Sequence, residues 1–156
     1  GFFTPLNMVV RSDFKNRLEL IDILVAGGAL LNPPPEFDES PLMSAISMND
    51  IEMIKELLKR GSDVNWEDSF GNTALANAVT DGNRTANVVR VLLEAGADPN
   101  KPMLWAGDNC LSILSFLDDP LYMRRDRVTK QIRRLVVEAG GKKYATKSHD
   151  QPCKPR

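Results

Sequence analysis

Apolar and polar positions alternate along this chain in a pattern that recurs at a near-constant spacing. Each unit opens with a small polar residue and a leucine and continues through two apolar stretches of helical periodicity. It then closes on glycine, often followed by a small residue and an asparagine. Leu6, Leu42, Leu75 and Leu111 mark four openings, which are separated by 36, 33 and 36 positions. A near-constant period of this length predicts a stacked array of helical units instead of one globular core.

The residues at these landmarks predict where the helices begin and end. A small polar side chain can accept a hydrogen bond from the free backbone N–H groups at a helix start, as at Thr4, Ser40, Thr73 and Asn109. A glycine after an apolar run can adopt the positive φ that closes a helix, as at Gly28, Gly61, Gly96 and Gly140. We therefore expect two helices in each unit. The turn between them should be longer in the first, third and fourth units, and longest around 118–126.

These openings and closings resemble those of a known repeat family. Thr4-Pro5-Leu6 at a helix start, and Gly96-Ala97-Asp98-Pro99-Asn100 after a second helix, are similar to the ankyrin repeat, whose period is about 33 residues. The resemblance implies an all-α, ankyrin-type helix-turn-helix solenoid with extended finger loops between repeats. The array would cover 1–144, in units of about 1–32, 33–65, 66–100 and 101–144. The family's histidine after Thr-Pro-Leu is absent from every unit.

The charges are divided unevenly between the two parts of the chain. Residues 1–120 carry nine basic and 18 acidic side chains, a net charge of −9, whereas residues 121–156 have a net charge of +8. Residues 145–156 lack apolar periodicity and predict a disordered tail. The basic residues of the predicted last helix form either a solvated outer face or a surface for nucleic acid, membrane or another acidic partner. They are Arg124, Arg125, Arg127, Lys130, Arg133 and Arg134.

The sequence offers little material for catalysis or cofactor binding. His149 is the only histidine and lies in the polar tail, so nucleophilic sites that pair histidine with serine or cysteine are excluded. Cys110 and Cys153 have no disulfide or metal spacing, and the glycine pairs stand at helix ends instead of phosphate-binding helix starts. We expect no enzyme activity, metal or cofactor, and a cytoplasmic location. Asn83-Arg84-Thr85 fits a glycosylation triplet, which matters only in a secreted chain.

A binding function remains, and the family resemblance indicates where. Ankyrin arrays generally meet protein partners with their finger tips and the inner face of each first helix. The positions implied by this mapping are Glu36, Phe37, Glu39, Met48, Ser69, Phe70, Asn72, Asp81, Trp105, Asp108, Phe116 and Leu117. Aromatic side chains dominate binding energy at interfaces, and the acidic members favour a protein partner with basic residues around an apolar patch.

Alternatives stay open at this stage. Phe70 and Trp105 can also fold back on their own fingers, and the turn around 118–126 can cover Phe116 and Leu117. Trp66 is interpreted as a packing residue. The chain can also be the recognition portion of a larger enzyme or effector, or it can bind acidic polymers or a membrane through its basic end.

Overall fold

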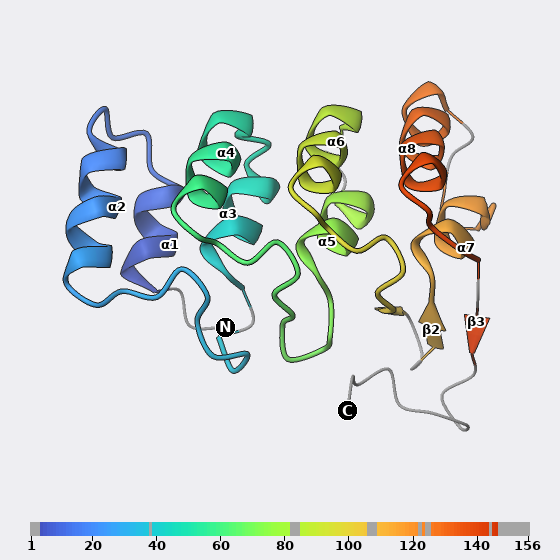
Figure 1. Ribbon diagram of the computed structural model, residues 1–156, viewed down its shortest axis with the longest axis horizontal. Coiled ribbons are helices and arrows are strands. Elements are labelled where there is room, and N and C mark those ends of the chain that lie inside the picture. The colour runs from blue at the N-terminus through green and yellow to red at the C-terminus, as the bar shows by residue number, and fades with distance from the viewer. Residues whose placement is uncertain are drawn as a thin grey trace.

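Four consecutive helix pairs stack side by side along one axis (Figure 1). The structure is a computed structural model that describes residues 4–37, 39–81, 85–105, 109–121, 123, 126–143 and 145–146. In Figure 1 the second helix of each of the last three pairs lies above the first helix, and the two helices of the first pair lie side by side. The first helices are α1 (Pro5–Val10), α3 (Pro41–Ser47), α5 (Ala74–Thr80) and α7 (Ile113–Asp118). The second helices are α2 (Arg17–Ala26), α4 (Ile51–Lys59), α6 (Ala86–Glu94) and α8 (Arg127–Glu138). The predicted helical solenoid is confirmed.

Local signals in the sequence set most of the helix boundaries. The hydroxyls of Thr4, Ser40 and Thr73 each accept a hydrogen bond from the backbone N–H three residues later, as predicted. The four predicted closing glycines have positive φ, which is 99° at Gly61. Only three residues, 48–50, separate α3 from α4, so the longer turns predicted for the other three units are also confirmed.

The fourth unit begins three residues later than the spacing predicted. Asn109 does not start a helix, because Asn109–Leu111 is strand β2, which pairs antiparallel with β1 (Met103–Trp105) and with β3 (Ala145–Thr146). Ser112 is the helix cap and accepts from the backbone N–H of Ser115. The equivalent of Leu75 is therefore Leu114, not Leu111.

The same small sheet corrects the predicted boundary of the tail. Ala145 and Thr146 form β3 against β2, so the predicted disordered tail over 145–156 cannot begin at 145. Residues 147–156 lie outside the part of the chain that the structure describes. The correction follows from strand pairing between segments far apart in sequence, which apolar periodicity in a single segment cannot reveal.

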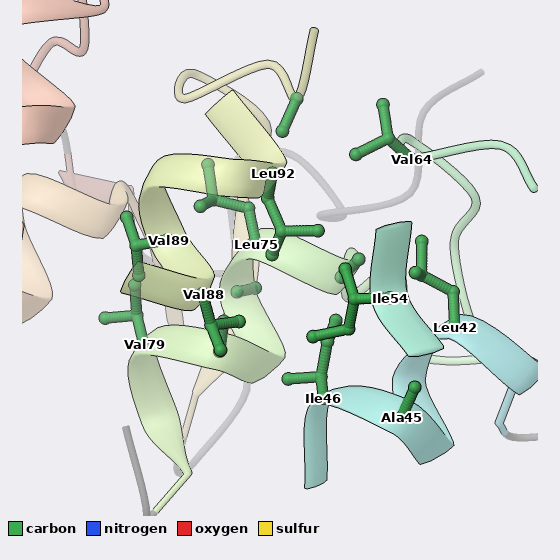
Figure 2. Close-up of a cluster of buried hydrophobic side chains, with 14 of the residues drawn as sticks. Leu42, Ala45, Ile46, Ile54, Val64, Leu75, Val79, Val88, Val89 and Leu92 are labelled. Atoms are coloured by element: carbon green, nitrogen blue, oxygen red, sulfur yellow. The ribbon is translucent and has the colours of Figure 1, made fainter. Parts of the chain in front are cut away.

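One continuous apolar core runs through the stack and holds the units together. Leu6, Leu42, Leu75 and Leu114 mark equivalent positions on the four first helices, and all four side chains are buried. Figure 2 shows side chains of the second unit, including Ile46 and Ile54, in one cluster with those of the third unit. Because each unit buries its apolar faces against its neighbours, the array positions the finger loops relative to one another.

Candidate functional site

Asparagine side chains join each unit to the next and fix the bases of the finger loops. The side-chain amide of Asn65 donates to the carbonyl of Gly96 at 3.0 Å, and its Oδ1 accepts from the backbone N–H of Asp98 at 2.8 Å. Asn32 and Asn100 make the same pair of bonds with the units that follow them. We call Asn32, Asn65 and Asn100 the asparagine ladder. These asparagines recur four positions after a closing glycine, which was the available sequence signal, but no role was predicted for them.

The finger between the second and third units is a closed turn that presents Phe70. The carboxylate of Asp68 accepts from the backbone N–H groups of Phe70 and Asn72, each at 2.8 Å. The side-chain amide of Asn72 donates back to Asp68 at 3.3 Å, so Asn72, a predicted contact residue, stabilises the loop. At the base of the finger, the indole N–H of Trp66 donates to the carbonyl of Pro33 at 2.7 Å, which agrees with a packing role.

A polar network joins the first two units. The guanidinium of Arg11 donates to the Glu39 carboxylate at 2.6 Å, and the Ser44 hydroxyl donates to the same oxygen at 2.9 Å. The side-chain amide of Asn7 donates to the Ser44 hydroxyl at 2.9 Å. Since Asn7 stands where the family has its histidine, this network supplies polar contacts between repeats in its place. Glu39 therefore has a structural role, whatever it contributes to binding.

Several predicted contact residues are exposed on the finger loops and at the end of α3. The side chain of Phe37 is 37% exposed and that of Phe70 is 57% exposed. Glu36, Ser69 and Met48 are also exposed. In Figure 1 the links between units extend below the helices, so the fingers lie on one side of the array. The fold thus brings two phenylalanines on consecutive fingers to the same side of the molecule.

Phe116 and Leu117, in contrast, are core residues. Their exposed fractions are 1% and 4%, so the prediction that they line the binding surface is wrong. The cause is the three-residue shift of the fourth unit, because alignment on Asn109 placed them at the end of the first helix. With Ser112 as the cap, they lie inside α7 and belong to the apolar cluster.

Three other predicted contact residues are either half-buried or not fully described by the structure. Asp81 is the C-cap of α5 and is half-buried. The backbone of Trp105 lies in β1, paired with Asn109, while its side chain falls outside the described part of the chain. Asp108 falls outside it too, as does Asn83 of the glycosylation triplet.

The basic end of the chain is partly neutralised by ion pairs. Nε of Arg133 donates to the Asp118 carboxylate at 2.8 Å, and Lys143 forms a second ion pair with the same group. The hydrogen bond from Arg133 lowers the pKa of Asp118 below its ordinary value. Arg134 pairs with Glu138 at 2.7 Å, whereas Arg127 and Lys130 are exposed. Arg124 and Arg125 lie outside the described residues.

The described residues form neither a metal-binding group nor a membrane-spanning helix. None of their His, Cys, Asp and Glu side chains gather in threes or more as metal ligands would. None of the described helices has the length and apolar character needed to cross a bilayer.

Comparison with known proteins identifies related sequences and structures. The profile of the family "Ankyrin repeats (3 copies)" matches residues 6–103. The mitochondrial disaggregase of Bos taurus is 44% identical over 66 residues, which are 42% of this chain and 10% of that protein. Ankyrin repeat protein R664 of Acanthamoeba polyphaga mimivirus is 29% identical over 134 residues, covering 78% of this chain and 80% of that protein. The crystal structure of an ankyrin repeat domain from Acinetobacter baumannii AYE has a TM-score of 0.67 at 26% identity, covering 90% of this chain and 66% of that chain.

Proposed function

Because this chain belongs to the ankyrin-repeat family, whose members generally bind other proteins, we propose that it binds a protein partner through its finger loops and first helices. The observation that carries the proposal is the exposure of Phe37 and Phe70 on consecutive fingers. The asparagine ladder joins the units from which these fingers extend. We call Phe37, Met48 and Phe70, with the acidic Glu36 and Asp81, the finger surface.

The physical basis of the proposed contact is the burial of aromatic side chains held on ordered loops. Phe70 follows Asp68, whose bonds to Phe70 and Asn72 close the loop before any partner arrives. A loop that is already closed loses little conformational entropy on binding, so more of the burial energy remains as affinity. Truncation of a well-buried aromatic anchor at an interface commonly costs about 2 kcal/mol or more.

The charge of the array indicates the kind of partner. Residues 1–120 have a net charge of −9, and Glu36 and Asp81 belong to the finger surface itself. Complementary charges steer association and disfavour partners of like charge. We therefore infer that the partner presents basic residues around an apolar patch.

We infer that the module itself has no catalytic activity. A second candidate function is that the chain is the recognition portion of a larger enzyme or effector. The similarity to the bovine disaggregase favours it, because the matched region is only 10% of that protein. In that case the finger surface would select the substrate or partner of the attached activity. Both candidates assign the same contact residues.

Capture of partners from the source cells tests the proposal. The immobilised native chain should retain a partner protein. The Phe70→Ala variant should bind that protein at least about tenfold more weakly, which corresponds to a loss of about 1.4 kcal/mol. Phe14→Ala is the matched control, because Phe14 is 55% exposed but lies in the turn between α1 and α2. Equal retention by Phe70→Ala and Phe14→Ala would contradict the proposed surface. Steep loss of binding with salt would instead favour a polyanion on the basic end.

A further inference from the structure

The two ends of the array differ in chemistry, and the first unit exposes apolar positions that the later units bury. The residues eight positions before the closing glycines are Leu20, Met53, Val88 and Ile132. The last three are at most 2% exposed, whereas Leu20 is half-buried. Four positions before the same glycines, Leu57, Leu92 and Val136 are fully buried, and Leu24 is only half-buried. The first unit thus lacks the cover that a preceding unit gives to the other three.

The most exposed members of this face are Met8 and Ile23. Ile23 is 60% exposed, while its equivalents Glu56, Val91 and Leu135 are half-buried. Met8, on α1, is 65% exposed, although Ser44 at the same position of α3 is fully buried. We call Met8, Leu20, Ile23 and Leu24 the N-terminal face.

At the opposite end of the array, charged residues replace apolar residues that are buried in the earlier units. Six positions after their caps, Val10, Ile46 and Val79 are buried apolar residues, and the equivalent residue in the last unit is Asp118. Seven positions before the closing glycines, Ile21, Ile54 and Val89 are buried, and the equivalent is Arg133. Asp118 and Arg133 bond to each other at 2.8 Å. A polar outer face is what a terminal repeat needs for solubility, and the N-terminal face does not have one.

The first unit also has the two backbone groups that accept and donate the asparagine-ladder bonds in the later units. In the second unit, the carbonyl of Gly61 and the backbone N–H of Asp63 bond to Asn32 of the preceding unit. The equivalent groups of the first unit are the carbonyl of Gly28 and the backbone N–H of Leu30. No residue that the structure describes bonds to either group.

We propose that the N-terminal face receives a further helix-turn-helix unit of the same repeat, whose closing asparagine bonds to Gly28 and Leu30. The same surface already forms the interface with the preceding unit in three places of this array, which identifies a repeat unit as its occupant. A second copy stacked head to tail fits poorly. It would present the Asp118–Arg133 ion pair, and at the ladder position four residues after Gly140 its sequence has Tyr144 in place of asparagine.

A fusion made from the chain's own parts tests the proposal. A copy of residues 33–72 is joined directly to Thr4, so that its Asn72 precedes Thr4 as Asn72 precedes Thr73 in the native chain. Stacking of the added unit should give one cooperative transition, with a melting temperature at least about 5 °C above that of the full native chain. Hydrogen exchange at the Leu30 amide should slow in the fusion, because that amide gains a bond.

Matched variants test whether the gain in melting temperature comes from stacking of the added unit on the N-terminal face or from the added residues alone. The double change Met8→Lys and Ile23→Lys should abolish the gain in the fusion yet leave the unfused chain's melting temperature nearly unchanged, because both side chains are exposed there. Replacing the added unit's closing asparagine by alanine should restore fast exchange at Leu30. Two separate transitions, or unchanged Leu30 exchange in the fusion, would overturn the proposal. Dimerisation of the native chain that Ile23→Lys abolishes would overturn it as well, and would assign the face to a second copy.

Discussion

The asparagine ladder makes a sharp prediction about how the units are coupled. Asn65→Ala removes the side-chain amide bond to Gly96 at 3.0 Å and the acceptor for the Asp98 N–H at 2.8 Å. A typical net contribution is about 0.5–1.5 kcal/mol per bond, and both bonds are exposed, so water can replace the lost partner and the lower end of that range applies. We expect the free energy of unfolding to fall by about 1 kcal/mol. The slope of unfolding with denaturant should also fall, because the second and third units are less tightly coupled.

Urea denaturation followed by circular dichroism measures both quantities. Asn87→Ala is the matched control, since Asn87 is exposed on α6 and its side chain has no hydrogen bond to any described residue. Alanine favours helix more than asparagine, so this control should be neutral or slightly stabilising. If Asn65→Ala and Asn87→Ala unfolded at the same urea concentration with the same slope, the ladder would not couple the units.

Three further predictions concern the closing glycine, the chain end and the terminal ion pair. Gly61→Val should lower the free energy of unfolding in urea by about 1 kcal/mol or more through backbone strain alone, because φ is 99° and an added Cβ would meet no atom within 4 Å beyond Gly61 and its chain neighbours. An unchanged midpoint would refute this. Removal of 147–156 should shift the melting temperature by no more than about 2 °C, whereas removal of 145–156 also deletes β3 and should lower it further. The pKa of Asp118 is lowered, so its pair with Arg133 stabilises the fold above the ordinary carboxyl pKa of about 3.9 and is lost as pH falls through the lower folded value. The stability difference between the native chain and Asp118→Asn should therefore shrink on acidification in this range, and a constant difference would contradict the assignment.

Local chemistry made the repeat architecture predictable from the sequence. Caps such as Thr73 and closing glycines such as Gly61 act within a few residues, so their side chains and φ preferences identify helix ends without tertiary information. The predicted start of the fourth unit was wrong because Asn109 and Ser112 are both residue types that commonly cap a helix. Pairing of Asn109–Leu111 with two other strands decided between them.

The candidate site could be predicted only in part for the same reason. Phe37 and Phe70 stand next to residues typical of turns, so the sequence could place them on finger loops, and the structure leaves both side chains exposed. Phe116 and Leu117 were placed by counting from Asn109, and an error of three residues in a helix moves a side chain from the surface to the core. The bonds of the asparagine ladder join residues about 30 positions apart or more, and the repeat pattern marks such residues without revealing their partners.

The affinity of the captured partner for a double finger variant tests the central claim most directly. Phe37→Ala combined with Phe70→Ala should weaken binding by about 2 kcal/mol or more in calorimetry, with an unchanged circular dichroism spectrum. Arg127→Glu combined with Lys130→Glu, on the exposed part of α8, should change the same affinity far less. Intact affinity in the phenylalanine variant together with its loss in the charge-reversed variant would contradict the finger surface and assign binding to the basic end.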